Sequence, residues 1–212
     1  MIIMKTINKS IISVILFISL IVVPHTAKSQ ITENGYIDVD WQFNIPINTS
    51  FADKAAGWGM SFDGGYYITD NFGIGAFMTY STNNEYIERQ TLKLTETSSL
   101  TTDQQHSIFQ LPFGVSVRYR FIPDAIVKPY MALKLGPEYS KVSSYYNSFT
   151  SSDDGWGFYV SPEIGTTIYF TSSQTVGIHL ALYYAYATNK SKVLIYDVKG
   201  LNNAGFKLGM SF

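Results

Sequence analysis

Apolar and polar side chains alternate one by one along most of the chain after about residue 35. The clearest run is YIDVDWQFNI (36–45), where Ile37 and Val39 lie on one side and Asp38 and Asp40 on the other. Successive side chains of a strand point to opposite faces, so a period of two indicates a β-strand with one apolar face. A helix would distribute the same residues around its circumference. Residues 36–45 are therefore predicted to form a strand.

Eight such runs follow one another and predict an all-β fold of eight antiparallel strands. Each run is about 10–14 residues long, enough to cross the hydrocarbon core of a membrane as a tilted strand. The links after runs two, four and six are short turns, such as TDNF (69–72) and TSSQ (171–174). The eight runs lie at about residues 36–45, 57–68, 72–81, 107–121, 128–140, 156–170, 175–187 and 203–212.

The links after runs one, three, five and seven are longer and polar. We expect loops at about 83–105, at SSYYNSFTSSDD (143–154) and at about 189–201. Alternation between short and long links is typical of an up-and-down membrane barrel with short periplasmic turns and longer external loops. The longest link, 83–105, is open to two interpretations: a protruding hairpin that extends the strands and binds a surface partner, or a mobile polar loop.

Periodicity alone leaves open which face of the strands points inward, because a soluble lipocalin-like cup alternates in the opposite sense to a membrane barrel. The polar faces carry many small residues together with charges of both signs, which suits the narrow interior of an eight-stranded barrel. The negative charges of these faces are Asp38, Asp40, Asp63, Glu138 and Glu163, and the positive ones are Arg118, Arg120, Lys134 and Lys207. We therefore predict polar side chains inside and apolar side chains in lipid, with Arg118 and Arg120 facing the aspartates of the first strand.

Aromatic residues gather near both ends of the apolar faces, as expected for two girdles at the membrane boundaries. The row expected toward the long links contains Trp58, Tyr80, Phe109, Tyr139, Trp156 and Tyr184. The row expected toward the short turns contains Ile68, Phe72, Tyr119, Phe121, Phe170 and Phe212. A soluble sandwich would instead bury these side chains and expose a sheet of glycine and serine.

The composition agrees with a membrane barrel and excludes several other classes. Charged residues make up 15% of the 212 residues, against about a quarter in soluble domains, and the length suits a single domain. The net charge of −1 gives no support for a nucleic-acid partner. Without any cysteine, the chain has no disulfide framework, thiolate metal site or lipobox cysteine.

The N-terminus has the pattern of a secretory signal peptide. Lys5 and Lys9 precede an apolar run (11–23), and Ala27 and Ser29 supply small residues before the expected cleavage site. The apolar run is shorter than the ~20 residues of a membrane-spanning helix, which argues against a single transmembrane anchor. The predicted organisation is a signal peptide at 1–29 and an outer-membrane β-barrel domain at 30–212.

Two segments of the mature chain resemble bacterial outer-membrane proteins. The ending NAGFKLGMSF (203–212) is similar to their terminal strand, and YYITDNFGIGAFMTY (66–80) is similar to the hairpins of OmpA/OmpX-like small barrels. The SQ cleavage context and the tyrosine-rich strands are similar to outer-membrane β-barrel domain proteins of the Bacteroidetes type. The resemblance implies an outer-membrane location in a Gram-negative bacterium and recognition of the C-terminal strand, ending at Phe212, by the barrel-assembly machinery.

The sequence offers few candidates for catalysis. His106 and Ser107 adjoin the longest link, and a lipid-modifying barrel would need such a pair beside an acid, for which Glu96 and Asp103 are the nearest candidates. No spacing brings these residues together, so we interpret His106 as a solvated loop histidine. His179 lies on the small, inward face of its strand and is expected to join the interior polar network.

Metal and cofactor sites receive no support, and we assign no catalytic, cofactor-binding or metal-binding residues. Asp153-Asp154-Gly155 lacks the spacing of a calcium loop and is interpreted as a turn entering the sixth strand. The expected function is a non-enzymatic outer-membrane barrel with a structural or surface-interaction role, in contact with outer-membrane lipid. An eight-stranded barrel is too narrow for a general porin. The alternatives are a lipid-modifying enzyme and a barrel that binds or transports small hydrophobic ligands.

Overall fold

The computed structural model describes residues 34–47, 51–147, 149–170 and 175–212 of the protein. The predicted signal peptide (1–29) and the predicted turn at 171–174 lie outside these residues. The described part of the chain has no helix long and apolar enough to cross a membrane.

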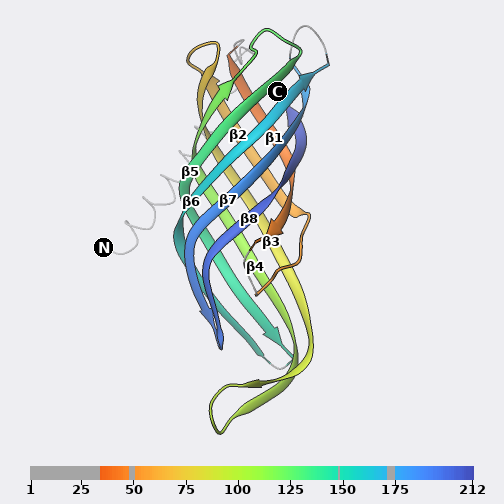
Figure 1. Ribbon diagram of the computed structural model, residues 1–212, viewed down its shortest axis with the longest axis vertical. Coiled ribbons are helices and arrows are strands. Elements are labelled where there is room, and N and C mark those ends of the chain that lie inside the picture. The colour runs from red at the N-terminus through yellow and green to blue at the C-terminus, as the bar shows by residue number, and fades with distance from the viewer. Residues whose placement is uncertain (1–33, 48–50, 148, 171–174) are drawn as a thin grey trace, which may run out of the picture. The chain divides into compact units, whose positions relative to one another are not determined.

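Eight antiparallel strands form a closed barrel (Figure 1). Each strand pairs with its neighbours along the chain, and β1 pairs with β8 to close the ring. This arrangement confirms the predicted up-and-down barrel. The strands are β1 (Gly35–Pro46), β2 (Trp58–Tyr67), β3 (Phe72–Lys93), β4 (Ser99–Arg120), β5 (Val127–Tyr146), β6 (Phe149–Tyr169), β7 (Gly177–Val193) and β8 (Tyr196–Ser211).

Strands β3 to β8 are longer than predicted because the polar links continue the strands. The segments expected as loops at 143–154 and 189–201 lie mostly in strands, and Asp153-Asp154-Gly155 lies inside β6, so these three predictions were wrong. The segment 83–105 forms the extended hairpin of β3 and β4, which Figure 1 shows reaching beyond the other strands at the bottom of the view. Side chains at 187–193 still alternate between buried and exposed. Between Thr188 and Lys192 both faces are polar, so the apolar contrast that predicts a strand is lost.

Polar side chains point into the barrel and apolar side chains point outward in the part that the sequence identified as membrane-spanning. Asp38 and Arg118 are 0% and 1% exposed, whereas Ile37 and Leu182 are 43% and 62% exposed. Large apolar side chains on the outside and ionic ones in the interior are the reverse of a soluble protein. The prediction that polar side chains face the interior and apolar side chains face outward is therefore confirmed for this part of the barrel.

Aromatic side chains mark the two ends of this apolar wall. At the end with the long hairpins, Trp58 and Trp156 are 76% and 65% exposed. At the end with the short turns, Phe72, Tyr119 and Phe170 are also exposed. We call the barrel between these rows the membrane belt. We call the described residues beyond the first row the outer extension, which comprises 51–57, 83–107, 141–147, 149–155 and 188–202.

The outer part of the barrel contains a hydrophobic cluster in place of charges. Side chains of the extended strands and of the segment before β2 pack together inside it, which departs from the prediction of a polar interior throughout. Where water surrounds the barrel, the hydrophobic effect favours burial of these apolar side chains. The cluster also continues into the belt through Phe77, Tyr159 and Tyr183. The cluster consists of Phe51, Ala52, Phe77, Ile108, Val142, Tyr159, Tyr183, Ala185, Ala187, Val193, Val198 and Leu201.

The segment 51–57 lies beside β3 where that strand has no strand neighbour on the β2 side. β2 begins only at Trp58, which pairs with Thr82, so β3 continues past the start of β2. The backbone N–H of Asp53 donates to Glu85 Oε2 at 2.9 Å, and the Asn83 amide donates to the carbonyl of Lys54 at 3.2 Å. The segment between β1 and β2 is therefore fastened to the edge of β3.

Glycine on the inner face makes room for a large aromatic side chain. A Cβ at Gly165 would lie 2.7 Å from ring and hydroxyl atoms of Tyr130, closer than atoms can approach without displacement. Gly165 therefore allows the Tyr130 ring to cross the narrow interior, in agreement with the predicted role of alternate glycines.

Candidate functional site

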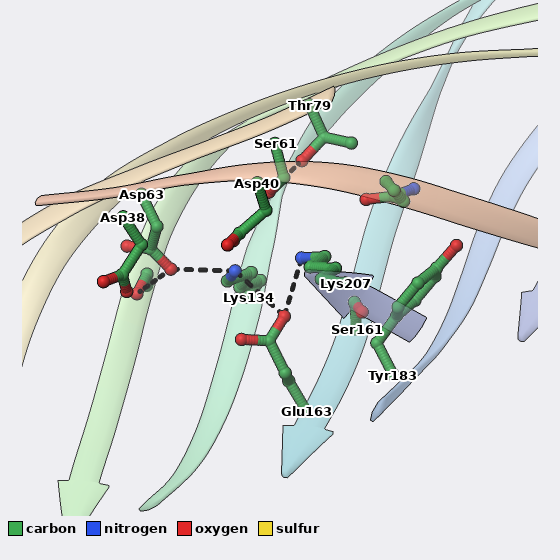
Figure 2. A network of polar contacts seen from close by, with 12 residues as sticks. Asp38, Asp40, Ser61, Asp63, Thr79, Lys134, Ser161, Glu163, Tyr183 and Lys207 are labelled. Carbon is green, nitrogen blue, oxygen red and sulfur yellow. Dashed lines mark hydrogen bonds and ion pairs between the residues drawn. The ribbon is translucent and has the colours of Figure 1, made fainter. Parts of the chain in front are cut away.

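A continuous chain of ion pairs crosses the interior of the membrane belt (Figure 2). Lys134 Nζ of β5 lies 2.8 Å from Asp63 Oδ2 of β2 and 3.0 Å from Glu163 Oε2 of β6. The same oxygen of Glu163 accepts from Lys207 Nζ of β8 at 2.6 Å. All four side chains are at most 1% exposed. Two lysines thus share one carboxylate, and the network links strands on opposite sides of the ring.

Arg118 of β4 extends this chain toward β1. Its Nη2 lies 2.6 Å from Asp38 Oδ2 and 3.4 Å from Asp63 Oδ2. The guanidinium lies over two tyrosine rings, 4.0 Å from the centroid of Tyr36 and 4.1 Å from that of Tyr130, so cation–π attraction adds to the ion pairs. The hypothesis that Arg118 meets an aspartate of the first strand is confirmed.

Arg120 does not take part in this network, although the sequence suggested that it would. Its Nε and Nη2 donate to the backbone carbonyl of Asp70 at 3.1 and 2.7 Å, and its guanidinium lies over the ring of Tyr67. Asp70 belongs to the turn between β2 and β3. Because Arg120 lies two residues nearer the short-turn end than Arg118, it reaches this turn and secures it.

His179 of β7 joins the network from the other side, as predicted. Its Nδ1 lies 2.7 Å from Asp40 Oδ1, and its Nε2 lies 2.5 Å from the hydroxyl of Tyr130. That hydroxyl also donates to Glu163 Oε1 at 2.8 Å. The tyrosine therefore connects the histidine–aspartate pair to the carboxylate shared by the lysines. The sequence placed Tyr130 on the polar face but gave no sign of this bridging position.

The network fills the interior of the belt with paired charges. Three carboxylates (Asp38, Asp63 and Glu163) pair with the cations of Arg118, Lys134 and Lys207, and His179 lies beside Asp38 and Asp40. Pairing is required because an isolated buried charge costs several kcal/mol. Further toward the outer extension, a cavity of about 10 Å³ between Ile108 and Leu201 has room for about one water molecule.

Glu138 is the exception among the buried acids. It is 0% exposed, and neither of its carboxylate oxygens has a hydrogen-bond partner among the described residues. Its strand neighbour across the β5–β6 ladder is Gly157, and only its backbone carbonyl accepts a hydrogen bond, from Asn189 at 3.1 Å. The predicted inward position of Glu138 is confirmed, but its side chain has no contact with the ion-pair network.

His106 is buried, so its interpretation as a solvated loop histidine was wrong. It is 0% exposed and stacks on the ring of Phe51 with centroids 4.0 Å apart. Nδ1 lies 2.5 Å from the carbonyl oxygen of Phe51, and Nε2 lies 3.1 Å from Gln104 Oε1. Burial lowers the pKa of His106, and the hydrogen bond to the Phe51 carbonyl opposes this shift. The alternation of buried residues in β4 was hidden by its polar sequence.

The residues considered for lipid-modifying catalysis do not come together. His106 points into the barrel, and Ser107, as its neighbour in the strand, belongs to the opposite face. Glu96 lies in the turn at the tip of the hairpin, between the ends of β3 and β4. The described residues also contain no group of three His, Asp or Glu side chains that could hold a metal ion.

The hairpin of β3 and β4 is the longest part of the outer extension. The two strands pair out to Lys93 and Ser99, with a register shift between Ile87 and Gln90. On the β3 side, pairing with β2 ends at Thr82, and on the β4 side, pairing with β5 ends at Gln104. The hairpin becomes a two-stranded ribbon only beyond the pair Ile87–Gln104, where β5 ends.

A family model described as outer membrane protein beta-barrel domain matches residues 13–212. The solved structure of Neisserial surface protein A is similar to this chain with 18% identity and a TM-score of 0.52, and the likeness covers 84% of this chain and 95% of that one. At this identity the likeness shows the shared barrel fold.

Two further solved structures are also similar over 84% of this chain. Ail of Yersinia pestis, in complex with the heparin analogue sucrose octasulfate, has 13% identity, 99% coverage of its own chain and a TM-score of 0.48. OprG of Pseudomonas aeruginosa has 13% identity, 94% coverage of its own chain and a TM-score of 0.47. A search of curated proteins gave no match.

Proposed function

This chain belongs to the outer membrane protein beta-barrel domain family, and from that premise we propose that it serves a structural or surface-interaction role as a non-enzymatic barrel that is not a general porin. It is a barrel of the outer membrane of a Gram-negative bacterium. The resemblance to Bacteroidetes-type proteins stays a prediction. The observation that carries the proposal is the contrast between an interior filled by paired side chains and a hairpin extending beyond the other strands.

The filled interior supports a role other than diffusion through a pore. Lys134, Glu163 and Lys207 meet across the belt, so an open path would require breaking buried ion pairs. We expect no stable conductance steps when the purified protein is inserted into planar lipid bilayers. Sustained ion-conducting steps from the folded barrel would contradict this part of the proposal.

The proposed surface role depends on the hairpin of β3 and β4. In this proposal the short turns face the periplasm and the outer extension faces the exterior, where the ribbon beyond Ile87 and Gln104 is available to a surface partner. The test uses cells that lack the protein, complemented with the full chain or with a variant in which residues 88–103 are replaced by an Asn-Gly turn that joins the paired residues Ile87 and Gln104. The full chain and the shortened variant should both produce heat-modifiable barrels, since the membrane belt is the same in the two.

The two readouts of this experiment separate a surface role from a structural one. Detergent sensitivity of the cells reports envelope integrity, and attachment of the cells to extracellular-matrix-coated plates reports surface interaction. In a surface role, the shortened variant restores detergent resistance to the level of the full chain but not attachment. If the shortened chain restores both detergent resistance and attachment as well as the full chain does, the hairpin has no role in surface interaction. Only the proposed structural role then remains.

The alternative of a lipid-modifying enzyme has a direct test. Because His106 and Ser107 point to opposite faces, we expect the His106→Ala and Ser107→Ala variants to leave the lipid A mass profile unchanged. A profile that changes when the protein is present and reverts in either variant would establish the enzyme instead.

Recognition of the C-terminal strand by the barrel-assembly machinery is also part of the proposal. Phe212 exchanges two backbone hydrogen bonds with Ile37, at 3.0 and 2.8 Å, and so takes part in closing the ring between β8 and β1. Deletion of Phe212 is expected to reduce the amount of heat-modifiable protein in the outer membrane. A normal amount of folded barrel in cells that produce the shortened chain would remove this role for the residue. Export by residues 1–29 likewise stays a prediction.

A further inference from the structure

A groove lies on the outer wall of the barrel at the boundary between the membrane belt and the outer extension. Its volume is about 530 Å³, within the range of roughly 300–1,000 Å³ that is typical of ligand sites. It spans β1, β2 and β3 at the level where β2 begins. The side chains that line it are Trp41, Trp58, Met60, Tyr80, Thr82 and Asn84.

The strand register explains how these side chains enclose a groove. Trp41, Met60 and Tyr80 are direct neighbours across β1, β2 and β3, with the methionine between the two aromatic residues. Trp58 stands one pair further out, opposite Thr82. The unbranched methionine forms a flexible floor, while aromatic side chains form the walls on both sides.

The Trp41 side chain is held in place by the segment before β2. Its indole N–H donates to the carbonyl of Gly57 at 2.6 Å. A Cβ at Gly57 would lie 2.8 Å from the ring of Trp41, so glycine permits this close approach. The groove therefore has one fixed aromatic wall and does not depend on a ligand to form it.

The two ends of the groove differ in polarity. Toward the belt, Trp41 and Tyr80 continue into the exposed apolar wall. Toward the outer extension, the lining ends in the hydroxyl of Thr82 and the amide of Asn84, which can bond to a headgroup. An apolar site with a few polar groups at one end matches a molecule that has a hydrocarbon chain and a polar head.

We propose that this groove binds one acyl chain of a membrane lipid from the leaflet on the long-hairpin side, more tightly than the surrounding wall does. The lipid headgroup lies against Thr82 and Asn84. The argument rests on continuity between the groove and the lipid-covered belt, and it is independent of the surface role proposed for the hairpin. A lipid held here would cover the Trp58 side chain, which is 76% exposed.

The second exposed tryptophan provides a matched control. Trp156 of β6 is 65% exposed in the same aromatic row but packs against Tyr139, with ring centroids 5.4 Å apart, and against Phe113 at 6.1 Å. Phe113 and Tyr139 therefore fill the space beside Trp156, whereas the corresponding space beside Trp58 is open. Replacing either tryptophan by alanine removes an exposed side chain of the same size from the same membrane level.

The experiment is native mass spectrometry of the folded protein extracted from vesicles of phosphatidylethanolamine and phosphatidylglycerol. The wild-type barrel should retain one lipid after detergent washing. Trp58→Ala should lower the retained fraction by about tenfold, which corresponds to ~1.4 kcal/mol, and Trp156→Ala should leave it unchanged. Heat-modifiability on gels confirms that each variant is folded, and Met60→Phe, which fills the floor of the groove, should reproduce the loss.

Three results would overturn the proposal. The first is a wild-type barrel without retained lipid, and the second is equal retention in the Trp58→Ala and Trp156→Ala variants, as expected for lipid that covers the whole wall. The third is an adduct with the mass of a free hydrocarbon or detergent in place of a membrane lipid, which would assign the groove to another kind of occupant.

Discussion

The membrane belt and the outer extension are built from the same strands but fill their interiors differently. In the belt, Glu163 and its two lysine partners lie inside, and Leu182 faces outward. In the outer extension, Val142 and Val198 are buried inside beside polar side chains such as Gln104 and Asn189. The strong contrast between a polar inner face and an apolar outer face is therefore confined to the belt, where lipid surrounds the barrel.

This difference shows where each region obtains its stability. Apolar side chains in the belt gain little from leaving water, because lipid solvates them on the outside, so the interior is organised by charge pairing and hydrogen bonds. The outer extension is surrounded by water and can use hydrophobic burial. Its cluster around Phe51 and Val142 resembles the core of a soluble β-protein in this respect.

The largest effect is expected from breaking the charge network of the belt. Glu163→Gln removes the only ion-pair partner of Lys207 among the described residues and one of the two partners of Lys134. Leaving a buried cation without its carboxylate should lower the free energy of unfolding by about 3–5 kcal/mol. Urea-induced unfolding of the barrel in lipid vesicles measures this change.

Glu138→Gln is the matched control for this prediction. Glu138 is also buried and inward-facing, but its carboxylate oxygens have no partner among the described residues. Replacing this unpartnered carboxyl group by a neutral amide breaks no ion pair, so it should change the free energy of unfolding by no more than about 1 kcal/mol in either direction. Equal losses in the two variants would show that the ion pairs are not the source of stability in the belt.

A smaller effect is expected from placing a lysine on the outer wall. Leu182→Lys, in the middle of β7, puts a cation into lipid and should cost about 2–4 kcal/mol. The same change at the exposed Gln105 of the outer extension should stay within about 0.5 kcal/mol, because water surrounds that position. The free energies of unfolding of the two variants, measured in vesicles, test where the membrane belt ends and the outer extension begins. Similar losses in the two variants would refute this assignment.

The smallest effect is a local pH dependence in the outer extension. Because burial lowers the pKa of His106 below its ordinary value of 6.5, the folded state binds fewer protons than the unfolded state in mildly acidic solution. The packing of Phe51 on His106 is then fully stable above about pH 6.5 and weakens as the pH falls below it. Amide NMR signals of residues 51–57, titrated in lipid nanodiscs, should report this loosening.

The His106→Gln variant tests whether the histidine is responsible. In this variant the signals of the 51–57 segment should no longer change between about pH 7.5 and about pH 5. An unchanged titration in the variant would assign the pH dependence to another group.

The fold of the belt could be predicted because lipid makes the two faces of each strand chemically distinct. Ile37 and Asp38 differ so strongly that period two is evident, and the inward positions of Arg118 and His179 followed from it. In the outer extension, Lys190 and Ser191 are both polar although one is exposed and the other buried. The hydropathy contrast is too small there to reveal a strand.

The sequence pattern did not predict which distant segments of the chain contact each other. Phe51 lies outside any alternating run, so its stacking on His106 depends on how the segment before β2 folds back against the barrel. The groove beside Trp58 likewise depends on where β2 begins relative to β3. Periodicity places a side chain on a face, but it does not determine which distant residue will occupy the space beside it.

The shared carboxylate of Glu163 has a consequence for the order of assembly. Lys134 lies 29 residues before it and Lys207 lies 44 residues after it, and Arg118 and Asp38 are 80 residues apart. A partial sheet inserted into the bilayer would therefore carry ions without counterions, a state of high free energy. Strands of this barrel should enter the bilayer together, in one cooperative step, because neutrality is reached only when the ring is nearly complete.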